Sequence, residues 1–327
     1  MMKSYRKIFS LVLFFIFSIP AFAIVLHPGY EPLPTWSGRP SSNVVGRWGA
    51  NASCVVISPD CIVTTNHQGG GVGTVVVIGA NSYTVTRVER YGTSDIRVAK
   101  LRYADLADFV AVYTGSSESN KNFVIGGYGV GRGAVLQTTG ITYGYAWDGL
   151  PNTTLRWGTN KVDSIDTPAS PGPLLIADFD GPSNYEAILA VRDSGGGWFM
   201  ESGGQWVLIG LSYGIELHDG YPSQSWFKNP TFPAIAAPDS FNSHRVSNYA
   251  AWINTTADQL ADCGLHPEDI SEDCKVDIVD IKEFAKWWAS NPLPSSVPRQ
   301  EADVNSDTAV NMLDFAKIAS QWNQNYW

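Results

Sequence analysis

A serine lies between an aspartate and three glycines in the stretch VRDSGGGWF, residues 191–199. A serine hydroxyl acts as a nucleophile when a base accepts its proton, a carboxylate orients that base, and N–H groups stabilise the oxyanion that forms. His67 ends the apolar run CIVTTNHQGG, and Asp95 opens the alternating segment TSDIRVAKL. Both residues therefore stand at the ends of predicted strands. Together with Ser194 they predict acyl-transfer chemistry in which Ser194 is the nucleophile.

The other four histidines stand in less suggestive settings. His27 and His266 lie in polar segments next to prolines, and His218 and His244 lie in predicted loops. We interpret all four as solvated side chains, which leaves His67 as the candidate base.

The elements around these residues are predicted to be short strands. Between residues 42 and 254, runs rich in β-branched and aromatic residues are separated by turn signals such as GAN, GGYG and ESGGQ. This pattern is typical of an all-β sandwich or barrel. Only VSNYAAWINTTADQLA, residues 246–261, has helical character. The fold class is therefore predicted to be mainly β.

Five ordered segments resemble the chymotrypsin-like (trypsin-family) serine endopeptidases. They are IVTTNH, SDIRVAKL, RDSGG, GQWVLIGLSYG and HRVSNYAAWIN, and the resemblance spans roughly residues 24–258. It implies a chymotrypsin-like double β-barrel with its active site in the cleft between the barrels. It also implies that Ser194 attacks the scissile carbonyl, that His67 is general base and then general acid, and that Asp95 holds the His67 tautomer.

The same resemblance implies roles for neighbouring residues. The backbone N–H groups of Arg192 and Ser194 would form the oxyanion hole, although the family usually has glycine where Arg192 stands. Ser212 would support Asp95. A groove for the substrate strand would be lined by Ser212, Tyr213 and Gly214.

Two more implications concern activation and specificity. Cleavage after residue 23 would give Ile24 a free amino group, similar to the terminus that pairs in activated family members with the aspartate before the nucleophile, here Asp193. The position that resembles the floor of the primary pocket is Ile188. Because Ile188 carries no charge, the resemblance argues against a preference for Lys or Arg in the substrate.

The N-terminus predicts export. Lys3, Arg6 and Lys7 precede the apolar run IFSLVLFFIFSI, which ends at the small-residue site AFA. This is the pattern of a secretory signal peptide over residues 1–23, and the run is shorter than the roughly 20 apolar residues that a membrane anchor needs. The protein is therefore predicted to be secreted, periplasmic or associated with the cell surface, with no membrane span after cleavage. Its formal net charge of −9 makes nucleic acid an unsuitable partner.

The four cysteines form two pairs that are close in sequence, Cys54 with Cys61 and Cys263 with Cys274. Disulfides persist in exported proteins, and neither pair has the spacing of a zinc or redox site. We therefore expect two local disulfides.

The segment after Cys263 is acidic and repeats itself. DISEDCKVDIVDIKEFAKWW and DVNSDTAVNMLDFAKIASQW superpose with a constant offset of 34 residues, and each is read as a loop followed by one amphipathic helix. Oxygen donors stand at loop positions one, three, five, nine and twelve, with a backbone carbonyl at seven, which suits Ca²⁺. The second loop offers Asp303, Asn305, Asp307, Asn311 and Asp314 with the carbonyl of Ala309, and the first offers Asp269, Ser271, Asp273, Asp277 and Asp280 with the carbonyl of Lys275.

These loops resemble the duplicated calcium loops of dockerin modules, which implies structural Ca²⁺ and a cohesin-like partner. The glycine expected at position six is Cys274 in one loop and Thr308 in the other. The alternative is a solvated acidic loop that caps a helix.

The predicted organisation is a signal peptide (1–23), a trypsin-like serine protease domain (24–262) and a small helical dockerin-like module (263–327). The predicted function is a secreted serine endopeptidase that hydrolyses peptide or protein substrates through an acyl-enzyme, with no cofactor for catalysis. The main alternative is a catalytically inactive protease-fold binding protein of an extracellular complex, which Arg192 favours. A carbohydrate-binding β protein is a weaker alternative, because most of the twelve tryptophans stand at apolar strand or helix positions.

Overall fold

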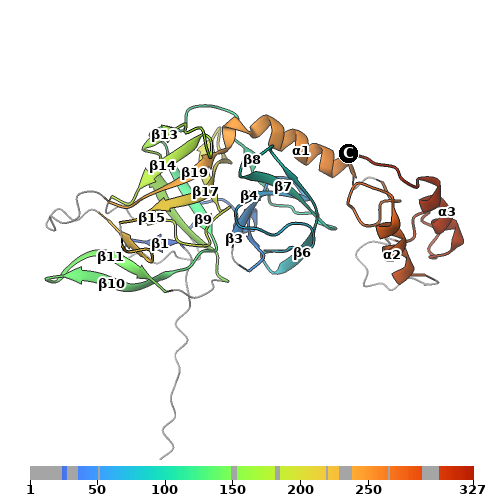
Figure 1. The fold of residues 1–327 in the computed structure, drawn as a ribbon, viewed down its shortest axis with the longest axis horizontal. Coiled ribbons are helices and arrows are strands. Elements are labelled where there is room, and N and C mark those ends of the chain that lie inside the picture. The colour runs from blue at the N-terminus through green and yellow to red at the C-terminus, as the bar shows by residue number, and fades with distance from the viewer. Residues whose placement is uncertain are drawn as a thin grey trace, which may run out of the picture.

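The computed structural model describes most of the chain after residue 23. The described residues are 24–27, 36–50, 52–148, 153–180, 185–218, 220–227, 238–263, 266–288 and 302–327. The predicted signal peptide lies outside them. Strands dominate up to residue 245 and helices follow, so the mainly β prediction is confirmed (Figure 1).

Six strands close into a barrel in the order β2-β3-β4-β7-β6-β5. The strands are β2 (Val45–Trp48), β3 (Ala52–Val56), β4 (Cys61–Thr65), β5 (Val75–Ile78), β6 (Asn81–Arg90) and β7 (Ile96–Leu101). The short sequence runs rich in valine, isoleucine and threonine favour this structure, because β-branched side chains pack well on a pleated surface. One apolar cluster, which includes Trp48, Val56, Ile62 and Leu101, fills this barrel.

A second sheet has the path β12-β9-β16-β17-β19-β14-β13, and β8 pairs with β17. Its strands are β8 (Ala111–Val112), β9 (Asn122–Gly127), β12 (Arg156–Lys161), β13 (Ser164–Asp166), β14 (Leu174–Asp178), β16 (Gly197–Ser202), β17 (Gln205–Glu216) and β19 (Ser240–Arg245). Among the described strands this path is not closed, so closure is observed for one of the two predicted barrels. Trp198 is fully buried in its core and stacks on Phe123.

Two smaller sheets complete the β part. One pairs β1 (Val25–Leu26) with β15 (Ala187–Ile188), and the other contains β10 (Arg132–Thr138), β11 (Ile141–Trp147) and β18 (Gln224–Trp226). Short 3₁₀ turns, η1 (Ser42–Val44) and η2 (Val246–Asn248), lead into β2 and into the first α-helix.

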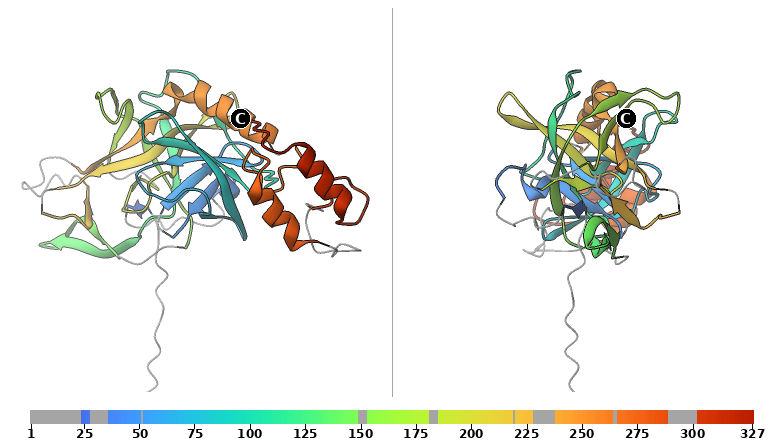
Figure 2. Two further views of the ribbon diagram at one scale, coloured as in Figure 1. Left: turned by 45° about the vertical axis from the view of Figure 1, so that its right-hand side comes forward. Right: turned by 90° about the vertical axis from the view of Figure 1, so that its left-hand side faces the viewer.

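The helix α1 (Ala250–Cys263) covers the junction between the barrel and the larger sheet. The apolar cluster at this junction contains Val63 and Val98 of the barrel, Phe199 of the sheet, and Ile253 and Leu260 of α1. The helical segment predicted from Val246 therefore begins as a 3₁₀ turn and continues as an α-helix. Figure 2 shows α1 running from the sheet past the barrel toward the C-terminal helices.

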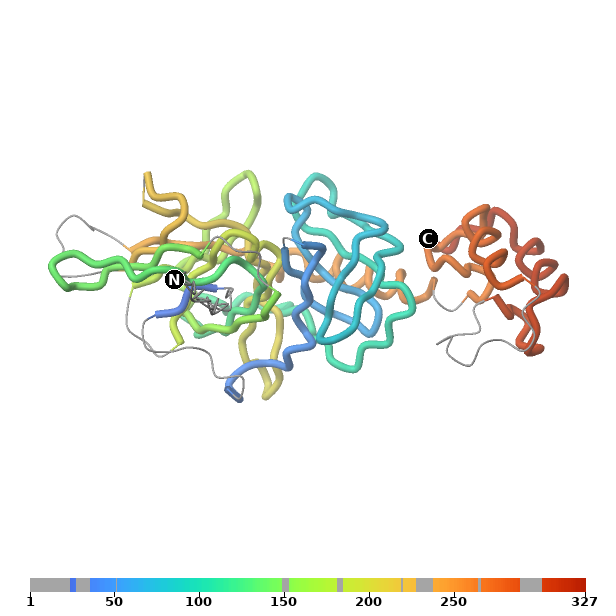
Figure 3. The backbone as a smooth tube through the Cα atoms, turned by 90° about the horizontal axis from the view of Figure 1, so that it is seen from below, coloured from blue at the N-terminus to red at the C-terminus, as the bar shows by residue number. Residues whose placement is uncertain are grey.

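The C-terminal segment contains α2 (Ile278–Lys286) and α3 (Met312–Ser320), one from each copy of the repeat. Their ring side chains Phe284 and Phe315 lie 6.0 Å apart in a small separate core. Seen from below, the larger sheet, the barrel and this segment follow one another in a row (Figure 3). The segment contacts the barrel, because Glu283 pairs with Arg102 at 3.1 Å and Glu272 accepts a hydrogen bond from the backbone N–H of Tyr103 at 3.1 Å.

One of the two predicted disulfides is present. Cys263 and Cys274 are bonded, whereas Cys54 and Cys61 are buried free thiols. The register of β3 and β4 pairs Val56 with Ile62, which puts Cys54 and Cys61 on opposite faces of the hairpin. Cys54 accordingly belongs to the core inside the barrel and Cys61 to the cluster under α1. The prediction of a Cys54–Cys61 bridge was wrong because closeness in sequence does not decide which face a strand residue occupies.

Candidate active site

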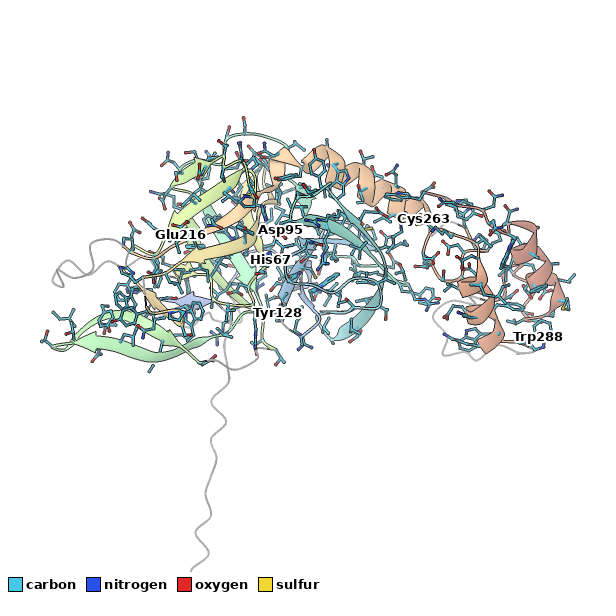
Figure 4. The ribbon with its side chains drawn as sticks, in the orientation of Figure 1. His67, Asp95, Tyr128, Glu216, Cys263 and Trp288 are labelled. Atoms are coloured by element: carbon cyan, nitrogen blue, oxygen red, sulfur yellow. A yellow bond between two sulfur atoms is a disulfide. The ribbon has the colours of Figure 1, made fainter. Side chains whose placement is uncertain are left out.

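His67 and Asp95 meet because β4 and β7 are neighbours in the barrel. Their register pairs Thr65 with Ile96, so His67 just after β4 and Asp95 just before β7 lie at the same end of the pair. The backbone N–H of Asn66 donates to the carbonyl of Asp95 at 2.7 Å and fixes this turn. Both side chains lie where the barrel meets the larger sheet (Figure 4).

The carboxylate of Asp95 orients the imidazole of His67. Oδ1 accepts the backbone N–H groups of Asn66 at 3.0 Å and His67 at 2.7 Å, and Oδ2 lies 2.7 Å from Nδ1 of His67. Burial alone raises the pKa of Asp95, but hydrogen bonds from His244 and His67 outweigh it and hold this pKa well below its usual range. Asp95 is therefore an anion that fixes His67 with its proton on Nδ1 and Nε2 free to accept.

Ser194 faces the other nitrogen of the same ring. Its Oγ lies 2.8 Å from Nε2 of His67, so the geometry lets His67 accept the hydroxyl proton. The turn that carries Ser194 is tied to the barrel, because the N–H of Ser53 donates to the Ser194 carbonyl at 2.9 Å. Gly195 is required there, since its φ is +80° and a Cβ would lie 2.3 Å from the carbonyl oxygen of Ser53.

Arg192 adopts a backbone conformation that favours glycine, the residue that the protease resemblance leads us to expect at this position. Its φ is +79°, in the left-handed region, where a side chain costs about 1 kcal/mol or more. Within the described residues, neither the N–H of Arg192 nor that of Ser194 donates to a protein acceptor. Within this part of the chain, both N–H groups are therefore left available at the turn that carries Ser194.

Asp193 points away from this turn into the protein. It is 1 % exposed, and its carboxylate accepts the N–H groups of Gly129 at 2.7 Å and Ala190 at 2.9 Å and the backbone N–H of Ile24. Burial raises the pKa of Asp193 to about 7, although these three donors lower it. The structure thus brings together Ile24 and Asp193, the two residues that the resemblance predicts to pair.

The residue that supports Asp95 is not the one expected. The hydroxyl of Ser212 accepts the indole N–H of Trp198 at 3.2 Å, and a hydrogen bond from Ser212 to Asp95 is not among those of the described residues. Nε2 of His244 instead lies 3.0 Å from Oδ2 of Asp95. His244 lies in β19 and is fully buried, so its interpretation as a solvated loop residue was wrong. Nothing in HRVSNY distinguishes a buried strand histidine from an exposed one.

A pocket of about 290 Å³ opens beside Ser194. Its lining is mostly apolar: Trp147, Leu189, Ala190, Val191, Arg192, Ser194, Tyr213, Gly214, Ile215, Leu217 and Pro222. Tyr213 and Gly214, which the resemblance places along a substrate groove, are among its lining residues and Ser212 is not. The ring of Tyr213 meets that of His67 edge-on, with centroids 5.6 Å apart. Ile188 is not among the lining residues, because its side chain is fully buried in the apolar core of the larger sheet. Ile188, which the resemblance places at the floor of the primary pocket, therefore does not line this pocket, whereas its neighbours Leu189 and Ala190 do.

The second acidic loop brings three of its predicted ligands together. Carboxylate oxygens of Asp303, Asp307 and Asp314 lie within 4.8 Å of one another. Asp303 accepts the N–H groups of Asp307 and Thr308, and Asn311 caps α3 by accepting the N–H of Leu313. The backbone N–H of Ala309 donates to Asp307 at 3.0 Å, and the side-chain N–H of Asn305 donates to Asp307 at 3.0 Å.

The first loop repeats this arrangement. Asp269 accepts the N–H groups of Asp273 and Cys274, Asp280 accepts those of Ser271 and Asp277, and Lys275 donates its N–H to Asp273. Cys274 and Thr308 both have positive φ values, +71° and +74°, so they adopt the conformation of the missing glycines. Burial raises the pKa of Asp269 to about 7, and the neighbouring charge of Asp280 adds to this effect. Carboxylates crowded in this way fit a cation, which would relieve their repulsion.

The comparison with known protein families identifies this segment. Residues 267–321 match the dockerin type I domain. The prediction of a dockerin module is therefore confirmed for this part of the chain, which we call the dockerin segment (residues 267–321). The chain matches none of the curated proteins. None of the described helices is long and apolar enough to cross a membrane.

Proposed function

We propose that this chain is a secreted serine endopeptidase that its dockerin segment attaches to an extracellular complex. The observation that carries the proposal is the continuous contact from Asp95 Oδ2 to His67 Nδ1, and from His67 Nε2 to Ser194 Oγ, at 2.7 and 2.8 Å. The mostly apolar pocket beside Ser194 supports a peptide side chain as the group that is recognised.

The reaction follows from these contacts. His67 accepts the proton of the Ser194 hydroxyl as Oγ bonds to the scissile carbonyl carbon, and Asp95 stabilises the imidazolium that forms. His67 then gives the proton to the leaving amine as the C–N bond breaks, which leaves an acyl-enzyme. A water molecule, deprotonated by His67, attacks the ester, and the acid product leaves as Ser194 regains its proton.

The oxyanion of each tetrahedral intermediate would accept the N–H groups of Arg192 and Ser194. Donors aimed at a developing charge are worth about 3–4 kcal/mol each in such sites. The left-handed conformation of Arg192 supports this role, because it is the backbone conformation that a glycine would adopt at this position.

Removal of the leader would give Asp193 a positively charged partner. Ile24 and Asp193 are buried and already in contact through the backbone N–H of Ile24. Cleavage before Ile24 would convert this N–H into a charged amino group and pair two buried opposite charges. We propose that this pair stabilises the turn that carries Arg192 and Ser194.

Dockerin domains bind calcium, and the two acidic loops fit that role. Asp303, Asp307 and Asp314 would hold one ion. By the repeat, Asp269, Asp273 and Asp280 would hold the other, with the remaining oxygens of each loop completing the ligands. The ion would order each loop against the helix that follows it.

A cohesin-like protein is the proposed partner. The first residues of both dockerin helices are exposed apolar side chains: Ile278 at 54 % and Val279 at 36 %, and Met312 at 60 % and Leu313 at 63 %. Exposed apolar pairs at equivalent positions of the repeat support a protein-binding surface. Replacing Met312 and Leu313 by Asp should weaken binding of this surface without unfolding the segment.

The experiment for the enzymatic proposal is labelling of the secreted, calcium-loaded chain with a fluorophosphonate, which reacts with activated serines. We expect covalent labelling of the wild type, and none in Ser194→Ala or His67→Ala. A folded wild type that is not labelled would favour the alternative function, a binding protein built on a protease scaffold.

A further inference from the structure

The carboxylate of Asp95 has two imidazole neighbours, and the proposed mechanism uses only one of them. His67 approaches Oδ2 at 2.7 Å from the active-site side, and His244 approaches the same oxygen at 3.0 Å from β19 of the larger sheet. Asp95 is an anion and can only accept, so Nε2 of His244 must carry a proton and donate it. Two donors thus converge on one oxygen, and two backbone N–H groups converge on the other.

His244 is held rigidly for this purpose. Its side chain is fully buried, and its backbone lies in the register of β19 between Leu211 of β17 and Leu174 of β14. The ring of Tyr213 packs against it with centroids 4.4 Å apart. Among the described residues, Nδ1 of His244 has no hydrogen-bond partner. The bond to Asp95 is therefore the one polar contact seen for this imidazole.

We propose that His244 is a positioning residue of the Ser194 site, whose Nε2–H fixes Oδ2 of Asp95 so that this oxygen faces Nδ1 of His67. The inference rests on the proposed peptidase function, because it assigns a role in the same proton transfer. Without His244 the Oδ2 atom would keep a single donor, and the carboxylate could turn about its Cβ–Cγ bond. A misdirected carboxylate would no longer hold the imidazole in line with Ser194.

The His244 contact also weakens the effect of the negative charge of Asp95 on His67. Oδ2 shares its negative charge between two donors, so removal of the His244 donor leaves more of that charge for the imidazolium of His67. The titratable groups placed around His244 are Asp95, with His67 beyond it, and Tyr213. Loss of the donor should therefore move the acid limb of the activity profile to higher pH, while the loss of orientation lowers the rate.

The test compares His244→Phe, which keeps a ring but has no donor, with His244→Gln, which keeps an N–H donor. His266→Gln is the control, since His266 stacks on Tyr326 in the C-terminal part of the chain. We expect kcat for a peptide substrate to fall up to about 100-fold in His244→Phe, with KM unchanged and the acid limb at higher pH. His244→Gln should recover at least a tenth of the wild-type kcat, and His266→Gln should match the wild type. A wild-type kcat and pH profile in folded His244→Phe would overturn the inference.

A second readout does not depend on catalysis. Nitrogen NMR of ¹⁵N-histidine-labelled wild type should show His244 with its proton on Nε2 and a bare Nδ1, and the His67 Nδ1–H resonance should move in His244→Gln. A proton on Nδ1 of His244 would overturn the inference even if His244→Phe fails to fold. If the wild type is not labelled by fluorophosphonate but shows the Nε2–H tautomer, the peptidase proposal fails and the His244–Asp95 contact stands.

Discussion

The disulfide between Cys263 and Cys274 joins the last residue of α1 to the sixth position of the first calcium loop. Cys274 stands where a glycine is expected and has a φ of +71°. The Cys274 side chain therefore strains its own backbone position but anchors the loop to α1. This helix covers the junction between the barrel and the larger sheet. Together with the contacts of Glu272 and Glu283 with the barrel, this bond fixes the dockerin segment on the protein.

Breaking this bond should loosen the segment without affecting the barrel. In Cys263→Ser/Cys274→Ser we expect the dockerin segment to lose about 2–4 kcal/mol of stability, because the closed loop no longer restricts the unfolded chain. Calorimetry in saturating Ca²⁺ should show a separate, earlier transition for the segment. Fluorophosphonate labelling of Ser194 should stay at the wild-type rate, and a loss of labelling would show that the segment is needed to order the active site.

The two barrel cysteines should remain thiols in the folded protein. Cys54 and Cys61 face opposite sides of the β3–β4 hairpin, and burial raises the pKa of the Cys54 thiol to about 12, so it is protonated and unreactive. An alkylating reagent should modify neither thiol in the folded chain and both after denaturation without reductant. Recovery of a Cys54–Cys61 peptide pair in a non-reducing digest would contradict the register of these strands.

Arg192→Gly should stabilise the turn beside Ser194. Glycine adopts a φ near +79° without the cost that a side chain pays, so we expect a gain of up to about 1 kcal/mol in the free energy of unfolding. Labelling and peptide hydrolysis should stay within a few-fold of the wild type, because the N–H donor is retained. A loss of kcat of more than tenfold would mean that the Arg192 side chain itself takes part, which the oxyanion proposal does not require.

The two acidic loops have separate sets of ligands and therefore predict two independent ion sites. Asp303→Asn/Asp307→Asn removes two carboxylates from the second loop and leaves Asp314 as the remaining one of the three that lie close together. The calcium stoichiometry of the chain should therefore fall from two ions to one. Asp269→Asn/Asp273→Asn is the matched change in the first loop. Isothermal titration with Ca²⁺ checks both, and two ions bound by either variant would contradict the assignment of ligands.

The sequence was sufficient for features that local patterns specify. The alternation of apolar residues predicted the strands, and the acidic spacing with an offset of 34 residues predicted both loops and their helices. The strand ends at His67 and Asp95 could be located because one apolar run ends just before His67 and another begins just after Asp95. The turn at Ser194 could be located because its glycines are conspicuous.

What the sequence missed depends on contacts between distant strands. His244 meets Asp95 across 149 positions of the chain, and only the pairing of β19 with β17 brings it there. Ser212 has an alternative partner in Trp198, which no local pattern reveals. The faces of Cys54 and Cys61 depend on the length of the β3–β4 turn, since a register shift of one residue would put both on the same face.

Leader removal should change how stability depends on pH through Asp193. With Ile24 uncharged, the pKa of Asp193 is about 7 in the folded chain against a usual 3.8, so the folded state holds a proton that the unfolded state has lost between these values. Its stability should therefore fall as pH rises from about 4 to about 7, by at most about 1.4 kcal/mol per pH unit. A free Ile24 ammonium favours the carboxylate, which lowers this pKa and removes most of the fall. The processed protein should consequently be the more stable form near pH 7.

The measurement compares thermal unfolding of the processed chain with that of a chain whose Ile24 amine is acetylated, both in saturating Ca²⁺ so that the acidic loops contribute equally. The two melting temperatures should diverge by several degrees as pH rises from 4 to 7, since 1 kcal/mol corresponds to about 2–4 °C in a protein of this size. In Asp193→Asn the divergence should vanish, because the amide does not titrate. Equal curves for the two wild-type forms would mean that the Ile24 amine does not reach Asp193, and activation by leader removal would have to be abandoned.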